Sequence, residues 1–249
     1  MRLMRCFLVL ILAFYFSSSL ASGQAPETDK KTATAGHAVS NVHTTDDLTI
    51  LRETQMGLDS KGYAGLVWWI PFEYWVRSAE ERGTAAEKTR EQIKALQDYT
   101  IVGVFVGKIS SLASLDYVIP ADLLKKTFIR DSDGQEYGPV SDLTGDAKNL
   151  ADILKPVLAN AMGRAGENFA FLFFPAKTKS GKRIADEMGP GSFSVVLKDV
   201  VGEPEAVFLW RTPLTSFTAP RYCPVGGERV HADWSFCPRH GVKLGQQQQ

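Results

Sequence analysis

Cysteine and histidine, the residue types most often used as nucleophiles and metal ligands, lie only near the two ends of this 249-residue chain. Residues 48–218 contain neither type, which excludes Ser-His-Asp and Cys-His catalysis within that stretch. The same stretch has no phosphate-binding glycine loop and no dinucleotide fingerprint. A Ser–Lys dyad or a pair of carboxylates needs no sequence motif and stays open.

The C-terminal run 221–244 (RYCPVGGERVHADWSFCPRHGVKL) contains two short, related motifs. It resembles a bacterial zinc ribbon, in which two Cys-Pro-x-Cys-Gly knuckles are joined by a hairpin. Residues 223–227 (CPVGG) match the first knuckle, with Gly226 where its second ligand belongs. Residues 236–241 (FCPRHG) match the second knuckle, with His240 in the corresponding place. The resemblance covers about a tenth of the chain and none of the stretch before it.

The resemblance implies that this hairpin is held together by a cross-link. Structural zinc takes four ligands, and Cys223, Cys237 and His240 occupy ligand positions. His231 can complete the set only if the hairpin is distorted. Alternatively, the two cysteines form a disulfide that closes a loop of fifteen residues, a constraint worth up to about 3 kcal/mol. We expect the disulfide and no cofactor, with zinc as the alternative and two free thiols as a third possibility.

The most unusual feature of the central stretch is an aromatic cluster, five side chains between Trp68 and Trp75. Such a cluster can stack sugar rings or line a peptide groove, although core packing is its usual role. If the region is a strand followed by a helix, we expect Trp69 and Tyr74 to face outward. Glu73 lies among them and is a candidate catalytic carboxylate if it is buried. An exposed acid at a helix start is the simpler interpretation.

The elements that would position these residues are predicted from hydrophobic pattern, turn residues and capping signals. Strands are predicted at 66–70, 99–109, 126–130, 135–140, 169–174, 192–198 and 206–211, and helices at 72–82, 84–97 and 146–162. Because strands and helices do not alternate regularly, a parallel doubly wound sheet is disfavoured. The sequence predicts an α+β fold, an antiparallel sheet or β-sandwich with an N-terminal helical segment and one inserted helix.

The first 23 residues have the features of a secretory signal peptide. Arg2 and Arg5 precede an apolar run at 6–16, which small polar residues follow. That run is shorter than the roughly 20 residues needed to span a bilayer, so no stable membrane span is expected after cleavage. The predicted organisation is a signal peptide (1–23), a flexible linker (24–46), an α+β body (47–218), a ribbon-like hairpin (219–245) and a disordered tail (246–249). The protein is expected to be periplasmic or secreted.

The chain has no formal net charge, because 28 Lys and Arg residues balance 28 Asp and Glu residues. Such a balance argues against nucleic acid as a partner. We favour a non-catalytic binding or scaffold module that contacts an envelope protein or a glycan. One alternative is an envelope hydrolase that uses carboxylates near the aromatic platform of Trp69, Glu73 and Tyr74. Another is a metal-binding protein that acts through Cys223, His231, Cys237 and His240.

Overall fold

The computed structural model describes residues 43–81, 93–110, 114–143, 145–149, 152, 156, 162–218, 221–231 and 234–245. Two antiparallel sheets form the framework of this part of the chain, with short helices around them, so the fold is α+β as predicted. The predicted signal peptide and the predicted C-terminal tail lie outside the described residues. Among the described residues, no helix is both long enough and apolar enough to cross a membrane.

The larger sheet, sheet A, is built around one long central strand. Its strands are β1 (Gln55–Ser60), β2 (Tyr63–Ile70), β3 (Tyr99–Ile109), β4 (Leu115–Tyr117) and β7 (Ala170–Pro175). They follow the order β1-β2-β3-β4, and β7 pairs with β3 as well. β2 runs antiparallel to β3 over its whole length, from the pair Tyr63–Lys108 to the pair Ile70–Ile101. The predicted strand 99–109 matches β3, whose β-branched and aromatic residues suit a strand buried on both faces.

The second sheet, sheet B, has four strands in the order β6-β5-β8-β9. They are β5 (Thr127–Arg130), β6 (Glu136–Tyr137), β8 (Gly191–Lys198) and β9 (Glu205–Thr212). The predicted Asp-Gly hairpin joins β5 to β6. Asp131 Oδ1 accepts the N–H groups of Asp133 and Gln135 at 2.9 Å each, and Gly134 adopts a φ of 83°. Positive φ at this position is the reason that the turn needs glycine.

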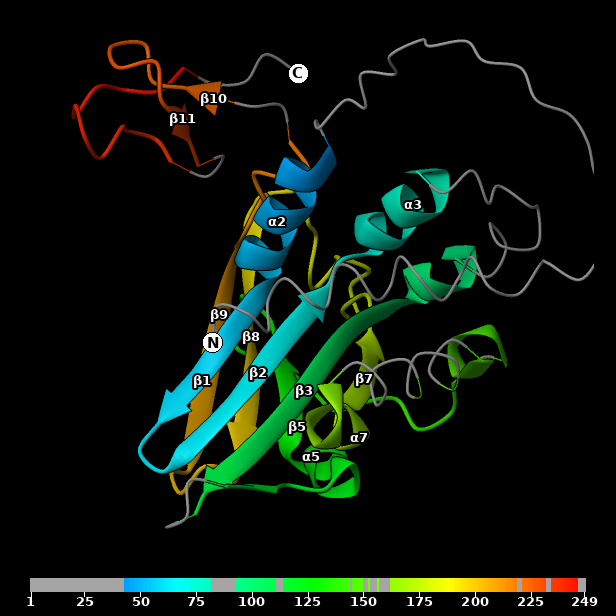
Figure 1. The fold of residues 1–249 in the computed structure, drawn as a ribbon. Coiled ribbons are helices and arrows are strands. Elements are labelled where there is room, and N and C mark those ends of the chain that lie inside the picture. The colour runs from blue at the N-terminus through cyan, green and yellow to red at the C-terminus, as the bar shows by residue number, and fades with distance from the viewer. Residues whose placement is uncertain are drawn as a thin grey trace, which may run out of the picture.

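The two sheets pack face to face through aromatic side chains, with β8 and β9 behind β1 and β2 in Figure 1. The Trp69 ring meets Phe193 at 4.8 Å and Trp210 at 6.3 Å between ring centroids. On the opposite face of β2, Trp68 meets Tyr74 of the following helix at 6.1 Å. The expectation that Trp69 and Tyr74 face outward is therefore wrong, because they are 1% and 9% exposed. Strand alternation separates Trp68 from Trp69 as expected, but both faces of β2 are covered.

The helices lie around the sheets, and those at Pro120–Lys126 and Arg164–Glu167 are not among the predicted ones. They are α2 (His43–Thr54), α3 (Phe72–Glu81), η1 (Leu96–Asp98), α5 (Pro120–Lys126) and α7 (Arg164–Glu167). The predicted helix 72–82 matches α3. The predicted linker 24–46 overlaps α2, whose first turn has no apolar period to reveal it. The predicted helix 84–97 lies mostly outside the described residues, and 146–162 is described only in part.

The C-terminal hairpin, called the ribbon below, follows sheet B and consists of residues 221–245. It contains β10 (Arg221–Tyr222), β11 (Arg229–Val230) and a second bridge between Phe236 and Lys243. Figure 1 shows it beyond the end of the sheets, near α2. It meets the body at the carboxylate of Glu53 and at the backbone oxygen of Thr215, which accepts from Arg229 Nη2 at 3.1 Å.

Glu53 lies near the end of α2 and contacts three parts of the chain. Its carboxylate accepts the N–H groups of Thr215 and Ser216 at 3.0 and 2.9 Å. Its backbone oxygen accepts the indole N–H of Trp210 at 3.1 Å. On the ribbon side, His231 Nε2 lies 3.5 Å from Glu53 Oε1. One side chain therefore links the first helix, the segment after β9 and the ribbon.

The position of Trp69 between the sheets predicts a large effect of truncation. Trp69→Ala should lower the free energy of unfolding by about 3–5 kcal/mol, because it leaves a cavity lined by Phe193 and Trp210. Urea unfolding followed by circular dichroism measures this loss. Trp234→Ala removes the same side chain from a position 41% exposed and should cost less than about 1 kcal/mol. Equal losses in the two variants would contradict the packing described here.

Candidate metal centre

Two tight turns of the ribbon have the same construction, and each holds one buried cysteine. In the first, the Gly227 N–H donates to the Cys223 carbonyl at 2.9 Å, and in the second the Gly241 N–H donates to the Cys237 carbonyl at 2.7 Å. Both glycines have positive φ, 69° and 65°. The first turn also directs the Gly226 N–H at Cys223 Sγ, 3.5 Å away. The two knuckles expected from the sequence are therefore present as backbone turns.

Four side chains bring their ligand atoms together between these turns: Cys223, Glu228, Cys237 and His240. All four atoms lie within 4.8 Å of one another. His240 Nδ1 is 3.4 Å from Cys223 Sγ and 3.6 Å from Cys237 Sγ. Glu228 Oε1 is 3.3 Å from Cys237 Sγ and 3.1 Å from His240 Nδ1. Two thiols, a carboxylate and an imidazole thus face one small volume.

Four of the six distances among these atoms are close to the edges of a tetrahedral zinc site. Zinc bonds of about 2.3 Å to sulfur and about 2.0–2.1 Å to nitrogen or oxygen place ligand atoms about 3.3–3.8 Å apart at tetrahedral angles, the longest edge being the one between two sulfurs. The measured sulfur–nitrogen and sulfur–oxygen distances lie between 3.3 and 3.6 Å. The nitrogen–oxygen distance, 3.1 Å, is slightly shorter. Along these four edges the side chains already have nearly the spacing that zinc requires.

Glu228 takes the place of the ligand that the first knuckle lacks. A Cβ atom added at Gly226 would collide with the Glu228 carboxylate and with the His240 ring. The carboxylate therefore fills the space that the missing side chain would occupy. Its Oε2 atom is buried and has no hydrogen-bond partner in the described part of the chain. A buried carboxylate oxygen without a partner is costly unless a cation is close to it.

The two thiols differ in acidity. Burial disfavours the Cys223 thiolate, but the backbone N–H groups of Gly226 and Val225 and neighbouring side chains outweigh it and lower the pKa of Cys223. Burial, together with the adjacent Cys223 and Glu228 side chains, raises the pKa of Cys237. The Glu228 carboxyl has a lowered pKa, chiefly because its own backbone N–H donates to it. Cys223 is therefore the more readily ionised of the two thiols.

Two sequence-based expectations for the ribbon differ from the structure. Cys223 and Cys237 are free thiols, so the expected disulfide is not formed. The His240 ring lies against both sulfur atoms, and the Glu228 carboxylate lies against one of them. The structure also places His231 outside the cluster, beside Glu53, because the hairpin is not distorted. Glu228 stands where His231 was expected, and the sequence signal for it is an acid two residues after a glycine in a ligand position.

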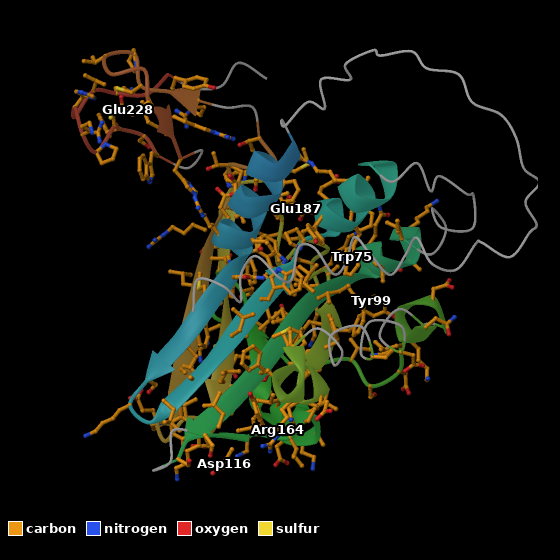
Figure 2. The ribbon with its side chains drawn as sticks, in the orientation of Figure 1. Trp75, Tyr99, Asp116, Arg164, Glu187 and Glu228 are labelled. Atoms are coloured by element: carbon orange, nitrogen blue, oxygen red, sulfur yellow. The ribbon has the colours of Figure 1, made fainter. Side chains whose placement is uncertain are left out.

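The candidate site in the body is not assembled as expected. Glu73 lies at the start of α3 and is half-buried, while Trp69 is covered by sheet B. The two therefore do not form an open aromatic platform. The Glu73 backbone N–H donates to Glu187 Oε1 at 3.1 Å. Figure 2 shows Glu187 beside α3, well away from Glu228 on the ribbon.

Glu187, which sequence reasoning missed, is the buried carboxylate of this region. Its residue is 4% exposed, and burial raises the pKa of its carboxyl against the N–H groups of Glu187 itself and of Glu73. It caps the first turn of α3, whose leading N–H groups have no partner within the helix. The residues around it (184–191, IADEMGPG) have no helix or strand period that would reveal its burial from sequence.

The chain has no match among models of known protein families, among curated proteins or among solved structures. The ribbon assignment therefore depends on features of its own residues. These are the two glycine-closed knuckles and the four convergent ligand atoms.

The raised pKa of Glu187 predicts how stability changes with pH. The folded protein holds the Glu187 proton to higher pH than the unfolded chain, in which glutamate titrates at about 4.3. The contribution of Glu187 to stability should therefore fall as pH rises above that value and level off beyond the folded pKa. Glu187→Gln keeps the acceptor for the Glu73 N–H and removes this fall. Urea midpoints of both proteins at pH 4 and pH 7 test it, and parallel changes would contradict the assigned cause.

Proposed function

We propose that this chain is a non-catalytic binding or scaffold module whose ribbon holds a structural zinc ion through Cys223, Glu228, Cys237 and His240. The observation that carries the proposal is the convergence of these four ligand atoms within 4.8 Å. Cys223, Cys237 and His240 come from the two knuckles, as structural zinc ligands commonly do, and Glu228 follows the first knuckle directly. The proposal replaces His231 with Glu228 in the ligand set.

A bound cation explains the charge and hydrogen bonding of the cluster better than a disulfide does. A disulfide would consume both thiols and leave the buried Glu228 Oε2 without a partner. It would also leave His240 beside sulfurs that no longer carry charge. A cation instead attracts the carboxylate and both thiolates at once, which offsets the cost of burying them. The N–H groups directed at Cys223 support its thiolate form.

The ligand types favour zinc over other common metals. Thiolates exclude magnesium and calcium, which bind through oxygen. Two sulfurs, one imidazole nitrogen and one carboxylate oxygen at tetrahedral spacing suit zinc. Four protein ligands fill the tetrahedron and leave no position for a substrate, so the proposed role is structural.

The proposed location is the cell envelope or the exterior, as the sequence of residues 1–23 suggests. A module of this kind would contact an envelope protein or a glycan. The proposal of a hydrolase that uses Glu73 receives less support, because Trp69 and Tyr74 are both buried and give no platform beside that carboxylate.

We expect one zinc ion per chain in protein recovered from the envelope of an exporting host. Native mass spectrometry of this material measures the metal, and the intact mass also reports whether residues 1–23 have been removed. Addition of a chelator should release the metal and loosen the ribbon. A metal-free protein that gains two hydrogen masses on reduction would instead establish a Cys223–Cys237 disulfide and overturn the proposal.

Ligand variants identify the site in the same protein. Cys237→Ser and Glu228→Gln should each weaken zinc binding by at least about 100-fold, since even the outer partners of metal ligands contribute about 10–100-fold. Competition with a chromophoric chelator measures the affinity. His231→Ala is the matched control, because His231 contacts Glu53 and not the cluster, and it should bind zinc as the wild type does.

The Glu228 carboxylate occupies the space that a side chain at position 226 would fill. Substitutions at these two positions should therefore have non-additive effects on zinc binding. Gly226→Cys alone should weaken zinc binding, because its side chain would collide with the Glu228 carboxylate and the His240 ring. Glu228→Ala alone removes a ligand and should also weaken it. The double variant frees the space and supplies a third thiolate, so it should bind zinc more tightly than either single variant. Cobalt(II) absorption reports the added thiolate. Additive losses of zinc affinity would contradict the idea that Glu228 takes the place of a ligand at position 226.

A further inference from the structure

β9 is the free edge of sheet B. It is eight residues long and pairs with β8 on one side only. Beyond that ladder, no backbone hydrogen bond joins residues 205–212 to another described residue. Edge strands of this length are ready to pair with another strand unless charge, proline or a bulge protects them.

The outward face of β9 carries apolar side chains in its middle and opposite charges at its ends. Along the strand this face presents Glu205, Val207, Leu209 and Arg211 in turn. Val207 is 51% exposed and Leu209 is 43% exposed, both among the exposed large hydrophobic residues of the described chain. The residues between them point inward, where Phe208 and Trp210 join the core.

This outward face is complementary to itself when reversed. In an antiparallel pair of two β9 strands centred on Phe208, Val207 of one copy lies opposite Leu209 of the other. In the same register Glu205 of one copy lies opposite Arg211 of the other. Because the pairing is two-fold symmetric, each of these contacts occurs twice. Directly opposed apolar pairs and opposite charges are the pairs that stabilise antiparallel strands.

The charges at the two ends of the strand are available for such a contact. The Arg211 side chain has no ion pair or hydrogen bond with the described part of the chain, and it lies beside an open hollow. Glu205 lies between two cations of its own sheet, 2.9 Å from Arg130 and 3.6 Å from Lys198, and its side chain is 36% exposed. A second arginine can therefore approach its solvent side.

We propose that two copies of this chain associate through β9, in antiparallel register centred on Phe208, to form one continuous eight-stranded sheet from two copies of sheet B. The pattern of acid, apolar, apolar and base along β9 is complementary to itself. A second copy of the chain therefore matches it at every outward position, whereas an unrelated peptide would match it only by chance. The contact involves one strand and few side chains, so the dimer forms reversibly and depends on concentration.

Sedimentation of the full mature chain over roughly a hundredfold range of concentration tests the association. The wild type should pass from monomer to dimer within that range. Leu209→Lys and Arg211→Glu should each weaken dimerisation by at least about tenfold, since each places a mismatched pair twice in the interface. Ile109→Lys and Lys108→Glu make comparable changes, apolar to basic and basic to acidic, at exposed positions of β3 and should leave the dimer intact.

Circular dichroism and thermal melting should show that all four variants remain folded. A wild type that stays monomeric throughout, or a dimer unaffected by Leu209→Lys and Arg211→Glu, overturns the proposal. In the first case the edge of β9 would be free for a different partner.

Cross-linking tests the register separately. The double variant Val207→Cys with Leu209→Cys should form a covalent dimer under mild oxidation, because each new thiol faces the other type in the second copy. Mass spectrometry of the linked peptides should join position 207 to position 209. Val207→Cys alone should cross-link poorly, since its counterpart is offset by two residues. Equal cross-linking of the single variant would reject the register centred on Phe208.

Discussion

The small size of the ribbon's core is the constraint on which its structure depends. Among its described residues it buries four hydrophobic side chains, Cys223, Val230, Cys237 and Leu244. Two of the four are the cysteines themselves, so little apolar surface remains to hold the hairpin closed. A hairpin of this size needs a cross-link or a metal to stay folded. The arrangement around the two sulfurs is therefore a condition for the ribbon's shape as well as a chemical site.

Most strands of the body could be predicted from the sequence, because their residues are β-branched or aromatic over long runs. The segments at 99–109, 192–198 and 206–211 correspond to β3, β8 and β9. β1 could not be predicted in this way, since its sequence (QMGLDS) is polar and contains glycine. It is a strand because β2 provides a complete antiparallel partner, from the pair Gln55–Trp68 to the pair Ser60–Tyr63. Tertiary pairing overrode local propensity there.

The candidate site could be predicted in part. The spacing of Cys223, Cys237 and His240 indicated two knuckles, and the structure brings these residues together. The knuckle pattern does not indicate Glu228, because this residue lies outside both knuckles. It directly precedes β11, and its side chain reaches back into the space beside Gly226. The outward positions of Trp69 and Tyr74 were wrong for a different reason. Alternation fixes which side chains share a face of β2, but the covering of each face depends on α3 and sheet B.

The contacts of Glu53 have a mechanical consequence. Whatever precedes His43 joins the folded body through α2, and Glu53 lies near the end of that helix. Its carboxylate holds the segment at Thr215 and Ser216, and its carbonyl holds the Trp210 indole. Tension applied to the N-terminal segment is therefore passed to sheet B across the strands instead of peeling α2 and β1 away one residue at a time. The ribbon, which contacts the same carboxylate through His231, shares that load.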